Sequence, residues 1–313
     1  MSSWRILLTD GLQSAGKEIL DPVGEVDDRK GITTEELLSG ISDYDAVIVR
    51  GRTKITEKVI KQAKKLKVVG RCGVGVDNID LQAAKENGIT VVNAPGATTT
   101  SVAELTIGLI FSIAREIPRA DAGMKNGEWL KKELVGVELD KKSLGIIGYG
   151  RIGSTVGKIA VSAGMRINAF DLFLTPETTL VDGGELLPFD EVIKKSDFIT
   201  VHTPLTETTR NLINEEAISN MKDGVFIICA ARGGIIDENA LLDGLNSGKV
   251  AGAALDVYVS EPPTNQELIN HPKVIATSHI GGQTADAQKQ ASIDISTEVL
   301  AALKGEELHW RVV

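Results

Sequence analysis

The sequence predicts an α/β protein with two doubly wound parallel sheets. Three observations indicate this class: strand-like runs alternate with helical stretches over the first ninety residues, a second such series begins at Ser143, and one long apolar helix separates the two. The 313 residues suffice for about two domains, each large enough to bury its own core. We therefore expect neither disulfides nor a structural metal to be needed for folding.

The first series consists of short β-rich runs that we expect to form neighbouring parallel strands. These are Arg5 to Thr9, Ala46 to Arg50, Lys67 to Gly70 and Ile89 to Val92, with charged amphipathic stretches such as Thr56 to Lys65 between them. Ser101 to Glu104 then has the form of a capping box, which opens the long apolar helix. We predict that this helix ends at Pro118 and connects the two domains.

The second series contains strand-like runs that are each followed by a helical or turn-rich stretch. They read SLGIIG, INAFD, DFITVH, VFIICAA and VAGAALDV, and they predict a second parallel sheet. A polar, helix-compatible segment from about Gly282 to Lys304 closes the chain. We expect it to return to the first domain, although a helix that simply closes the second domain fits the pattern equally well.

Charge, thiol content and hydropathy exclude several kinds of partner. The net charge of −9 disfavours nucleic acid, because a negative surface repels phosphates. Cys72 and Cys229 form neither a disulfide framework nor a metal-ligand spacing, which favours a reducing, cytoplasmic setting without a bound metal. The longest apolar runs fall far short of the roughly 18 residues that cross a bilayer, and the N-terminus does not resemble a signal peptide.

A glycine-rich sequence, Gly148-Tyr-Gly150-Arg-Ile-Gly153, lies between a strand-like run and a helix-compatible one. This is the context of the Rossmann fingerprint, in which the glycines permit a tight turn, a close approach to a pyrophosphate and helix–strand packing. Asp171 ends the next strand, at the distance expected of an acid that binds a ribose hydroxyl. Because this acid repels the extra phosphate of NADP, we expect NAD. The alternative is a tight turn and a surface carboxylate without a ligand.

Transfer of a hydride to or from a carbonyl carbon also requires a proton, and imidazole suits that exchange near neutrality. His279 lies in a glycine-flanked turn after the strand-like VIAT, which suits a residue at the carboxyl end of a sheet. His202 follows a predicted strand and could line a cofactor cleft without reacting. We interpret His271 and His309 as structural or solvated.

A histidine acts best when a carboxylate fixes its tautomer and favours its protonated form. Glu261, in a Glu-Pro-Pro turn, is a candidate for that carboxylate. Arg232, in Ala231-Arg-Gly-Gly, has the planar guanidinium that suits a substrate carboxylate and carbonyl oxygen. Taken singly, each of these residues is more often an ordinary loop residue than a catalyst.

The order of these motifs is that of a known family. GYGRIG with Asp171, HTPL, ARGG, the Glu-Pro-Pro turn and the HIGG turn follow one another as in the D-isomer-specific 2-hydroxyacid dehydrogenases, which the whole chain resembles from about Arg5 to Leu303. VRGRTKIT, VVGRCGVGVDNIDL, VNAP, AELTIGLI, GAALDV and HIGGQTADAQ resemble more narrowly the members that oxidise phosphoglycerate. Ser278 and Cys229 depart from the family's usual proline and asparagine, and PGATTTSVAE differs from its usual connecting loop.

The resemblance implies a cofactor domain inserted into a substrate domain. Residues 1–97 and 283–313 would form the substrate-binding domain, and residues 98–282 the Rossmann-like NAD-binding domain. Arg232 would bind substrate, Glu261 orient the histidine and His279 act as acid and base. Cofactor contacts would come from Val74, Gly148, Gly150, Arg151, Ile152, Gly153, Asp171, His202, Thr203, Pro204, Ala230, Ala231, Arg232, Asp256, His279, Gly281 and Gly282.

The resemblance also implies a phosphorylated 2-hydroxy acid as substrate. Its carboxylate would meet the amides of Gly73, Val74 and Gly75, and its phosphate the cations Arg50, Arg71 and Lys131, while Arg52 and Lys132 are further available cations. The expected reaction is NAD-dependent oxidation of 3-phospho-D-glycerate to 3-phosphohydroxypyruvate, in serine biosynthesis. The alternatives are a glyoxylate, hydroxypyruvate or D-lactate reductase, and an NAD(H)-sensing corepressor without turnover.

Two further expectations concern assembly and regulation. Members of the family commonly form homodimers through the cofactor domain, and the apolar helix Leu105 to Ala114 is a candidate contributor. The chain ends at Val313, where some phosphoglycerate-oxidising relatives continue into a serine-sensing domain, so we expect no feedback inhibition of that kind.

Overall fold

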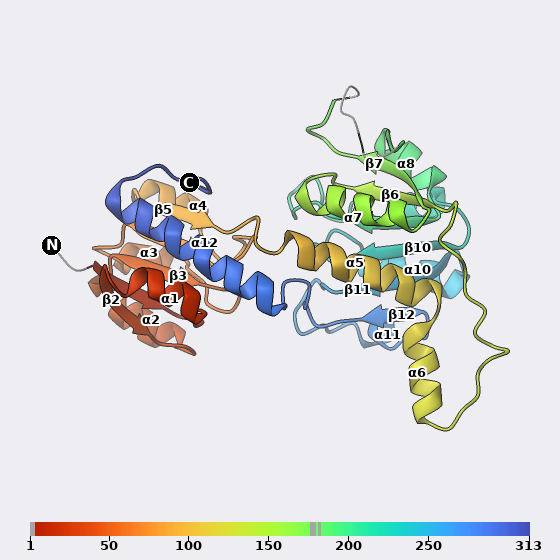
Figure 1. Cartoon of the computed structure of the whole chain (residues 1–313), viewed down its shortest axis with the longest axis horizontal. Coiled ribbons are helices and arrows are strands. Elements are labelled where there is room, and N and C mark those ends of the chain that lie inside the picture. The colour runs from red at the N-terminus through yellow and green to blue at the C-terminus, as the bar shows by residue number, and fades with distance from the viewer. Residues whose placement is uncertain (1–3, 176–179, 181–182) are drawn as a thin grey trace. The chain divides into compact units, whose positions relative to one another are not determined.

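The computed structural model describes residues 4–175, 180 and 183–313. The chain divides into two compact units, one comprising the described part of Met1–Thr98 together with Gly282–Val313, the other the described part of Thr99–Gly281. Each unit is built on an all-parallel sheet with helices on both faces, of five strands in the first unit and seven in the second (Figure 1). The predicted α/β class with two doubly wound parallel sheets is confirmed.

The first unit has the strand order β2-β1-β3-β4-β5. Its strands are β1 (Trp4–Leu8), β2 (Gly24–Asp28), β3 (Ala46–Val49), β4 (Val68–Arg71) and β5 (Thr90–Asn93), and its helices are α1 (Ser14–Leu20), α2 (Thr34–Gly40), the 3₁₀ helix η1 (Ile41–Asp43), α3 (Glu57–Gln62), α4 (Leu81–Glu86) and α12 (Ala285–Lys304). The strand β2, of sequence GEVDD, was not predicted. It lies at an edge of the sheet, where acidic residues of low β propensity are tolerated because one side stays in water.

Alternate residues of these strands pack into two hydrophobic cores, one on each face of the sheet. Ile6 and Leu8 face α12, where they pack with Ile295 and Val299, whereas Leu7 faces the side covered by α2, α3 and α4. Figure 1 shows α12 lying beside α1 across this sheet. The C-terminal segment then reaches the free edge of β5, where the Val91 amide donates to the Val313 carbonyl at 3.1 Å and the Val312 amide donates to the Val91 carbonyl at 2.7 Å.

The second unit has the strand order β12-β11-β10-β9-β6-β7-β8. Its strands are β6 (Ser143–Ile147), β7 (Arg166–Phe170), β8 (Glu185–Leu186), β9 (Phe198–Val201), β10 (Val225–Cys229), β11 (Val250–Leu255) and β12 (Val274–Ala276), and its helices are α5 (Thr99–Ala114), α6 (Ile117–Lys125), α7 (Arg151–Ser162), α8 (Phe189–Lys195), α9 (Glu215–Asn220), α10 (Glu238–Ser247) and α11 (Gln266–Ile269). The chain runs from β6 outward to β7 and β8, and then restarts at β9 on the other side of β6. The crevice outside the carboxyl ends of β6 and β9 is therefore the topological switch point, where such sheets bind ligands.

Both faces of this sheet are buried. Ile146 and Phe198 pack with α5 and α7, which lie side by side, while Ile147 and Ile199 pack with α8, α9 and α10 (Figure 1). The short edge strand β8 was not predicted. Among the described helices, none combines the length and the apolar character that a membrane crossing needs.

The long helix after the first sheet differs from its prediction at both ends. It begins at Thr99, so Ser101 lies buried inside the helix and does not cap it. Four consecutive hydroxyl residues from Thr98 all suit an N-cap, and the pattern alone does not select one of them. The helix ends at Ala114, and Pro118 lies in the first turn of α6 because proline is tolerated there. Thus Pro118 starts a helix rather than ending one.

Candidate active site

The three glycines of the fingerprint each meet a different steric demand at the end of β6. Gly148 has a φ of +91°, and a Cβ on it would lie 2.9 Å from the carbonyl carbon of His202. A Cβ on Gly153 would lie 2.1 Å from the carbonyl oxygen of Gly148, so α7 packs on the turn only without a side chain there. Gly150, the N-cap of α7, faces open space. This is the pattern that a pyrophosphate site requires, with an open approach to the N-terminus of a helix.

Two buried polar atoms flank this turn at the end of β9. The Oγ1 of Thr203 and the Nδ1 of His202 have no hydrogen-bond partner among the described residues. Burial lowers the pKa of His202 to about 4, so the imidazole is neutral near pH 7 and does not serve as the proton carrier. Since buried polar groups are normally satisfied, these atoms are suited to a ligand at the switch point.

Asp171 follows β7 and reaches back to the glycine turn. Its carboxylate accepts hydrogen bonds from the amides of Tyr149 and Phe173, both at 2.9 Å. The next two side chains are apolar and exposed, Leu172 by 67% and Phe173 by 91%, so they offer no cation to a 2′-phosphate. The glycine turn, the unpartnered Thr203 hydroxyl and this acid together fit NAD, whose nicotinamide accepts or returns a hydride when bound.

A second group of polar residues lies at the carboxyl ends of β11 and β12, on the same edge of the sheet. The Nδ1 of His279 lies 2.7 Å from Oε2 of Glu261. His279 has a φ of +54°, in the left-handed region that non-glycine residues seldom adopt, and its side chain is 48% exposed. The structure therefore brings together two of the three residues predicted to catalyse.

Asp256 holds the turn that carries His279. This fully buried carboxylate accepts hydrogen bonds from the Thr277 hydroxyl at 2.6 Å and from the amides of Ile280 and Gly281 at 2.8 Å each. The resemblance implied that Asp256 contacts the cofactor. In the structure its oxygens accept from the turn and fix residues 277–281, and the cofactor contact of Asp256 stays a prediction.

Arg232 lies in the loop after β10, as predicted. Its guanidinium donates to the carbonyl of Ala231 at 2.6 Å. A Cβ on the next residue, Gly233, would lie 1.8 Å from the carbonyl oxygen of Tyr258, so this loop rests directly on the segment that leads to Glu261. The backbone segments of all three predicted catalytic residues are thus connected through Tyr258 and Asp256.

The first unit gathers its predicted substrate residues at the carboxyl edge of its own sheet. Arg50 follows β3 and Arg71 ends the neighbouring β4. The guanidinium of Arg71 donates to the carbonyl of Cys72 and lies against Gly73, whose φ is +141°. The carbonyl of Val74 accepts from the Asn93 side chain at 2.7 Å and that of Gly73 accepts from the Ala94 amide at 2.9 Å, so Asn93 and Ala94 hold this loop.

Arg52, by contrast, is held by the fold. It donates to the carbonyls of Thr9 and Ile32 at 2.9 and 3.0 Å and forms an ion pair with Asp10 at 2.9 Å. These contacts give it a structural role rather than the substrate role for which it was available.

Comparison with known proteins decides the family. The family described as "D-isomer specific 2-hydroxyacid dehydrogenase, NAD binding domain" matches residues 107–281, more than half of the chain. The chain belongs to this family. The predicted resemblance is confirmed, and the second unit contains the NAD-binding domain of a 2-hydroxyacid dehydrogenase.

Individual members of the family match along almost the whole chain. The D-3-phosphoglycerate dehydrogenases of Methanocaldococcus jannaschii and Sus scrofa are 48% and 44% identical to it over 96% and 97% of the chain, which spans 58% and 57% of their lengths. A solved glyoxylate reductase from Paecilomyes thermophila is 32% identical, with a TM-score of 0.92 over 100% of this chain and 99% of that one.

Some predicted residues of this 2-hydroxyacid dehydrogenase stay predictions. Lys131 lies exposed in the segment after α6, and no described contact joins it to Arg232, Glu261 or His279. The cofactor roles of Pro204, Arg151, Ile152, Ala230, Ala231, Gly281 and Gly282 depend on a bound ligand.

Three residues that organise the site were not found from the sequence. Asp10 accepts the Arg50 amide at 2.7 Å, Asn78 donates to the carbonyls of Arg50 and Thr53, and Tyr258 connects two strand ends. Taken together, their hydrogen-bond partners lie between 3 and 43 positions away along the chain, with the longest span between Asp10 and Thr53. The one available signal was position, because Asp10 directly follows the predicted strand Arg5 to Thr9.

Proposed function

We propose that this 2-hydroxyacid dehydrogenase oxidises 3-phospho-D-glycerate to 3-phosphohydroxypyruvate with NAD. The observation that carries the proposal is the contact of 2.7 Å between His279 and Glu261, at the same sheet edge as a glycine turn that fits the cofactor. The similarity to D-3-phosphoglycerate dehydrogenases supports the choice of substrate.

In this proposal the His279–Glu261 pair accepts the proton of the substrate hydroxyl. Because Nδ1 is engaged with Glu261, Nε2 is the atom that takes the proton from the C2 hydroxyl. NAD, when bound at the glycine turn, would accept the hydride that leaves C2, so that loss of the hydroxyl proton to His279 and of the hydride from C2 would leave a C2 carbonyl. The Glu261 carboxylate stabilises the imidazolium that results and keeps the ring in one tautomer.

Charge recognition is assigned to arginines and to backbone amides. Arg232 holds the carboxylate and the developing carbonyl oxygen, since a guanidinium donates two parallel hydrogen bonds. The amides of Gly73, Val74 and Gly75 bind the carboxylate, and Arg50, Arg71 and Lys131 bind the phosphate. The Arg50 side chain has no hydrogen bond or ion pair among the described residues, which suits a cation that awaits a ligand.

A phosphate-free substrate is the second candidate. The glyoxylate reductase of Paecilomyes thermophila covers the whole chain at 32% identity, and the same catalytic trio would serve glyoxylate or hydroxypyruvate reduction. Besides the similarity to D-3-phosphoglycerate dehydrogenases, the cations proposed to bind the phosphate favour a phosphorylated acid, so a variant of one of them separates the two candidates.

The test is a substrate panel measured on the wild type and two charge-reversed variants. We expect NADH formation from 3-phospho-D-glycerate to exceed that from D-glycerate and D-lactate, and Arg50→Glu to raise the KM of the phosphorylated acid about 10- to 100-fold, the size of a lost charged hydrogen bond. Lys58→Glu, an exposed cation of α3 with the same charge change, serves as the control. Preference for glyoxylate, unaffected by Arg50→Glu, would establish the second candidate instead.

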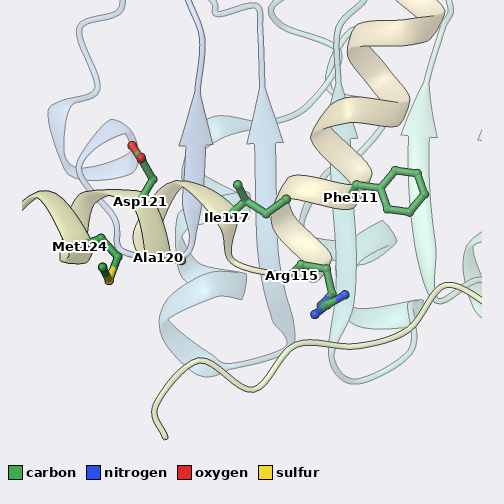
Figure 2. A pocket seen from close by; sticks show the side chains of 6 residues that line it. All are labelled: Phe111, Arg115, Ile117, Ala120, Asp121 and Met124. Carbon is green, nitrogen blue, oxygen red and sulfur yellow. The ribbon is translucent and has the colours of Figure 1, made fainter. Parts of the chain in front are cut away.

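We further propose a homodimer that forms through the second unit. The apolar residues of α5 predicted for this contact mostly pack on its own sheet, so the prediction is revised toward α6. Phe111, Ile117 and Met124 are 42%, 50% and 59% exposed. They line a depression together with Arg115, Ala120 and Asp121, and Figure 2 shows them along the end of α5 and the length of α6.

A second copy of the chain is the occupant we assign to this surface. Trp129 and Val135, which follow α6 in the chain, are also exposed, by 75% and 81%. Exposed apolar side chains that gather on a surface mark protein–protein contacts. Ultracentrifugation should give a dimer for the wild type and a monomer for Ile117→Asp combined with Met124→Asp. Val259→Asp, at an exposed apolar residue elsewhere, should remain dimeric.

We place the protein in the cytoplasm, because Cys72 and Cys229 are buried free thiols that a reducing compartment preserves.

A further inference from the structure

Tyr258 connects the two strand ends from which the proposed acid–base pair extends. Its hydroxyl lies 2.9 Å from the carbonyl oxygen of Leu255 and 2.8 Å from that of Thr277. Leu255 is the last residue of β11, and Thr277 stands directly after β12, two positions before His279. The side chain is only 6% exposed and belongs to the core of the second unit.

The hydroxyl acts as a donor toward both carbonyls. It has one proton, which the two oxygens share, and neither oxygen can donate in return. Burial, with the nearby Asp256 carboxylate, raises the pKa of Tyr258 to about 12, so the proton stays on the hydroxyl at any working pH. The contact therefore persists through the pH range of catalysis.

The backbone of Tyr258 reaches the other two residues of the trio. Its amide donates to Oε1 of Glu261 at 3.3 Å, while Oε2 of the same carboxylate faces His279. Its carbonyl oxygen forms the surface on which Gly233, next to Arg232, rests without room for a side chain. One residue thus contacts the segments of Arg232, Glu261 and His279.

We propose that Tyr258 is a positioning residue, whose hydroxyl sets the distance between the His279 imidazole and the Glu261 carboxylate. The inference rests on the proposed function, in which that pair exchanges the substrate's proton. Tyr258 touches neither substrate nor cofactor in this account. It fixes the register between the turn that carries His279 and the loop that carries Glu261.

The test compares Tyr258→Phe with Tyr44→Phe. Each variant removes one hydroxyl from a buried ring, since Tyr44 is 5% exposed in the first unit and donates to Asp27. We expect Tyr258→Phe to lower kcat about 10- to 100-fold, because small displacements of reacting groups carry penalties of this size. NAD affinity should hold, and the acid limb of the pH profile of kcat should move. In Tyr44→Phe, kcat and its pH profile should match the wild type.

A second readout does not depend on turnover. The proton between Nδ1 of His279 and Glu261 should give a low-field NMR resonance, assigned by its absence in His279→Asn. We expect this resonance to shift or broaden in Tyr258→Phe and to stay in place in Tyr44→Phe. If the resonance shifts in Tyr258→Phe while the wild type oxidises no 2-hydroxy acid, the positioning role is supported and the proposed function is contradicted. An unmoved resonance, whatever happens to kcat, would overturn the inference.

Discussion

Asp10 and Asp256 are buried carboxylates that lie just after β1 and β11 in the two units, and both hold a loop that carries a proposed functional residue. Asp10, whose side chain is 5% exposed, accepts from the amide of Arg50 and from the hydroxyl of Thr53, and it pairs with Arg52. Asp256, fully buried, accepts from neutral donors of the turn around His279, and within residues 4–175, 180 and 183–313 it forms no ion pair. Each unit thus holds a loop with a buried carboxylate, which is paired with a cation in the first unit and bound by neutral donors in the second.

The difference matches the tasks that we propose for the two loops. A carboxylate neutralised by Arg52 leaves Arg50 as an uncompensated positive charge, which suits recognition of an anion. A carboxylate held by two amides and a hydroxyl constrains the direction of a backbone turn, which suits transfer of a proton along a defined line. The first unit therefore uses its carboxylate to present charge, and the second uses it to set geometry.

We expect the largest effects from the matched variants Asp256→Asn and Asp10→Asn. Each keeps the shape of the side chain and turns one acceptor into a donor that faces a donor. We expect Asp256→Asn to lower kcat about 10²-fold through displacement of His279, and Asp10→Asn mainly to raise the KM of the phosphorylated acid. Steady-state kinetics on both variants would break the comparison if the same parameter changed in each.

The next largest effect is a loss of folding stability in acid that arises in the second unit, from its buried His202. Folding lowers the pKa of His202 from 6.5 to about 4, so between these values the unfolded chain binds a proton that the folded chain does not. The stabilisation is fully present above pH 6.5 and is lost as the pH falls toward 4. It amounts to about 2 kcal/mol between pH 7 and pH 5.

Denaturant unfolding of the NAD-free protein checks this. His202→Gln should flatten the pH dependence by about that amount, because the variant has no group to titrate there. His309→Gln is the control, since this exposed histidine is the one that the first unit contains. If His202→Gln and His309→Gln changed the pH dependence of the free energy of unfolding equally, the buried histidine of the second unit would not be its cause.

The smallest effect concerns a third buried carboxylate, Glu298 of α12. It is 3% exposed and accepts from the amides of His309 and Trp310 at 3.2 and 3.0 Å, which attaches the C-terminal tail to the edge of β5. Glu298→Gln should lower the free energy of unfolding by about 1–2 kcal/mol, the value of hydrogen bonds to a charged acceptor. Hydrogen exchange should quicken at Val91 and Val312, and it should stay unchanged in Glu307→Gln, an exposed neighbour.

Features set by neighbouring residues were predictable from the sequence. The glycine turn, Asp171 and the strands of alternating apolar character each follow from a short run of residues, and the structure has them where they were expected. The edge strand β2 was missed because its acidic residues have low β propensity and only its place in the sheet permits them. The ends of α5 were wrong because hydroxyl residues and proline suit more than one position near a helix end.

Contacts between distant segments were not predictable. Asp10 pairs with Arg52, and Tyr258 connects β11 to β12, because particular loops meet at a sheet edge. No local sequence pattern encodes which loops meet there. The family resemblance supplied the pairing of His279 with Glu261, while the structure supplied the residues that fix the pair.

The central claim is that His279 exchanges the proton of a 2-hydroxy acid while a bound NAD accepts the hydride. The most direct measurement is turnover of 3-phospho-D-glycerate by His279→Asn beside a titration of NAD binding to the same variant. We predict that kcat falls by roughly 10²- to 10⁴-fold, as for loss of a general base, with the Kd for NAD unchanged. Turnover equal to that of the wild type would contradict the account.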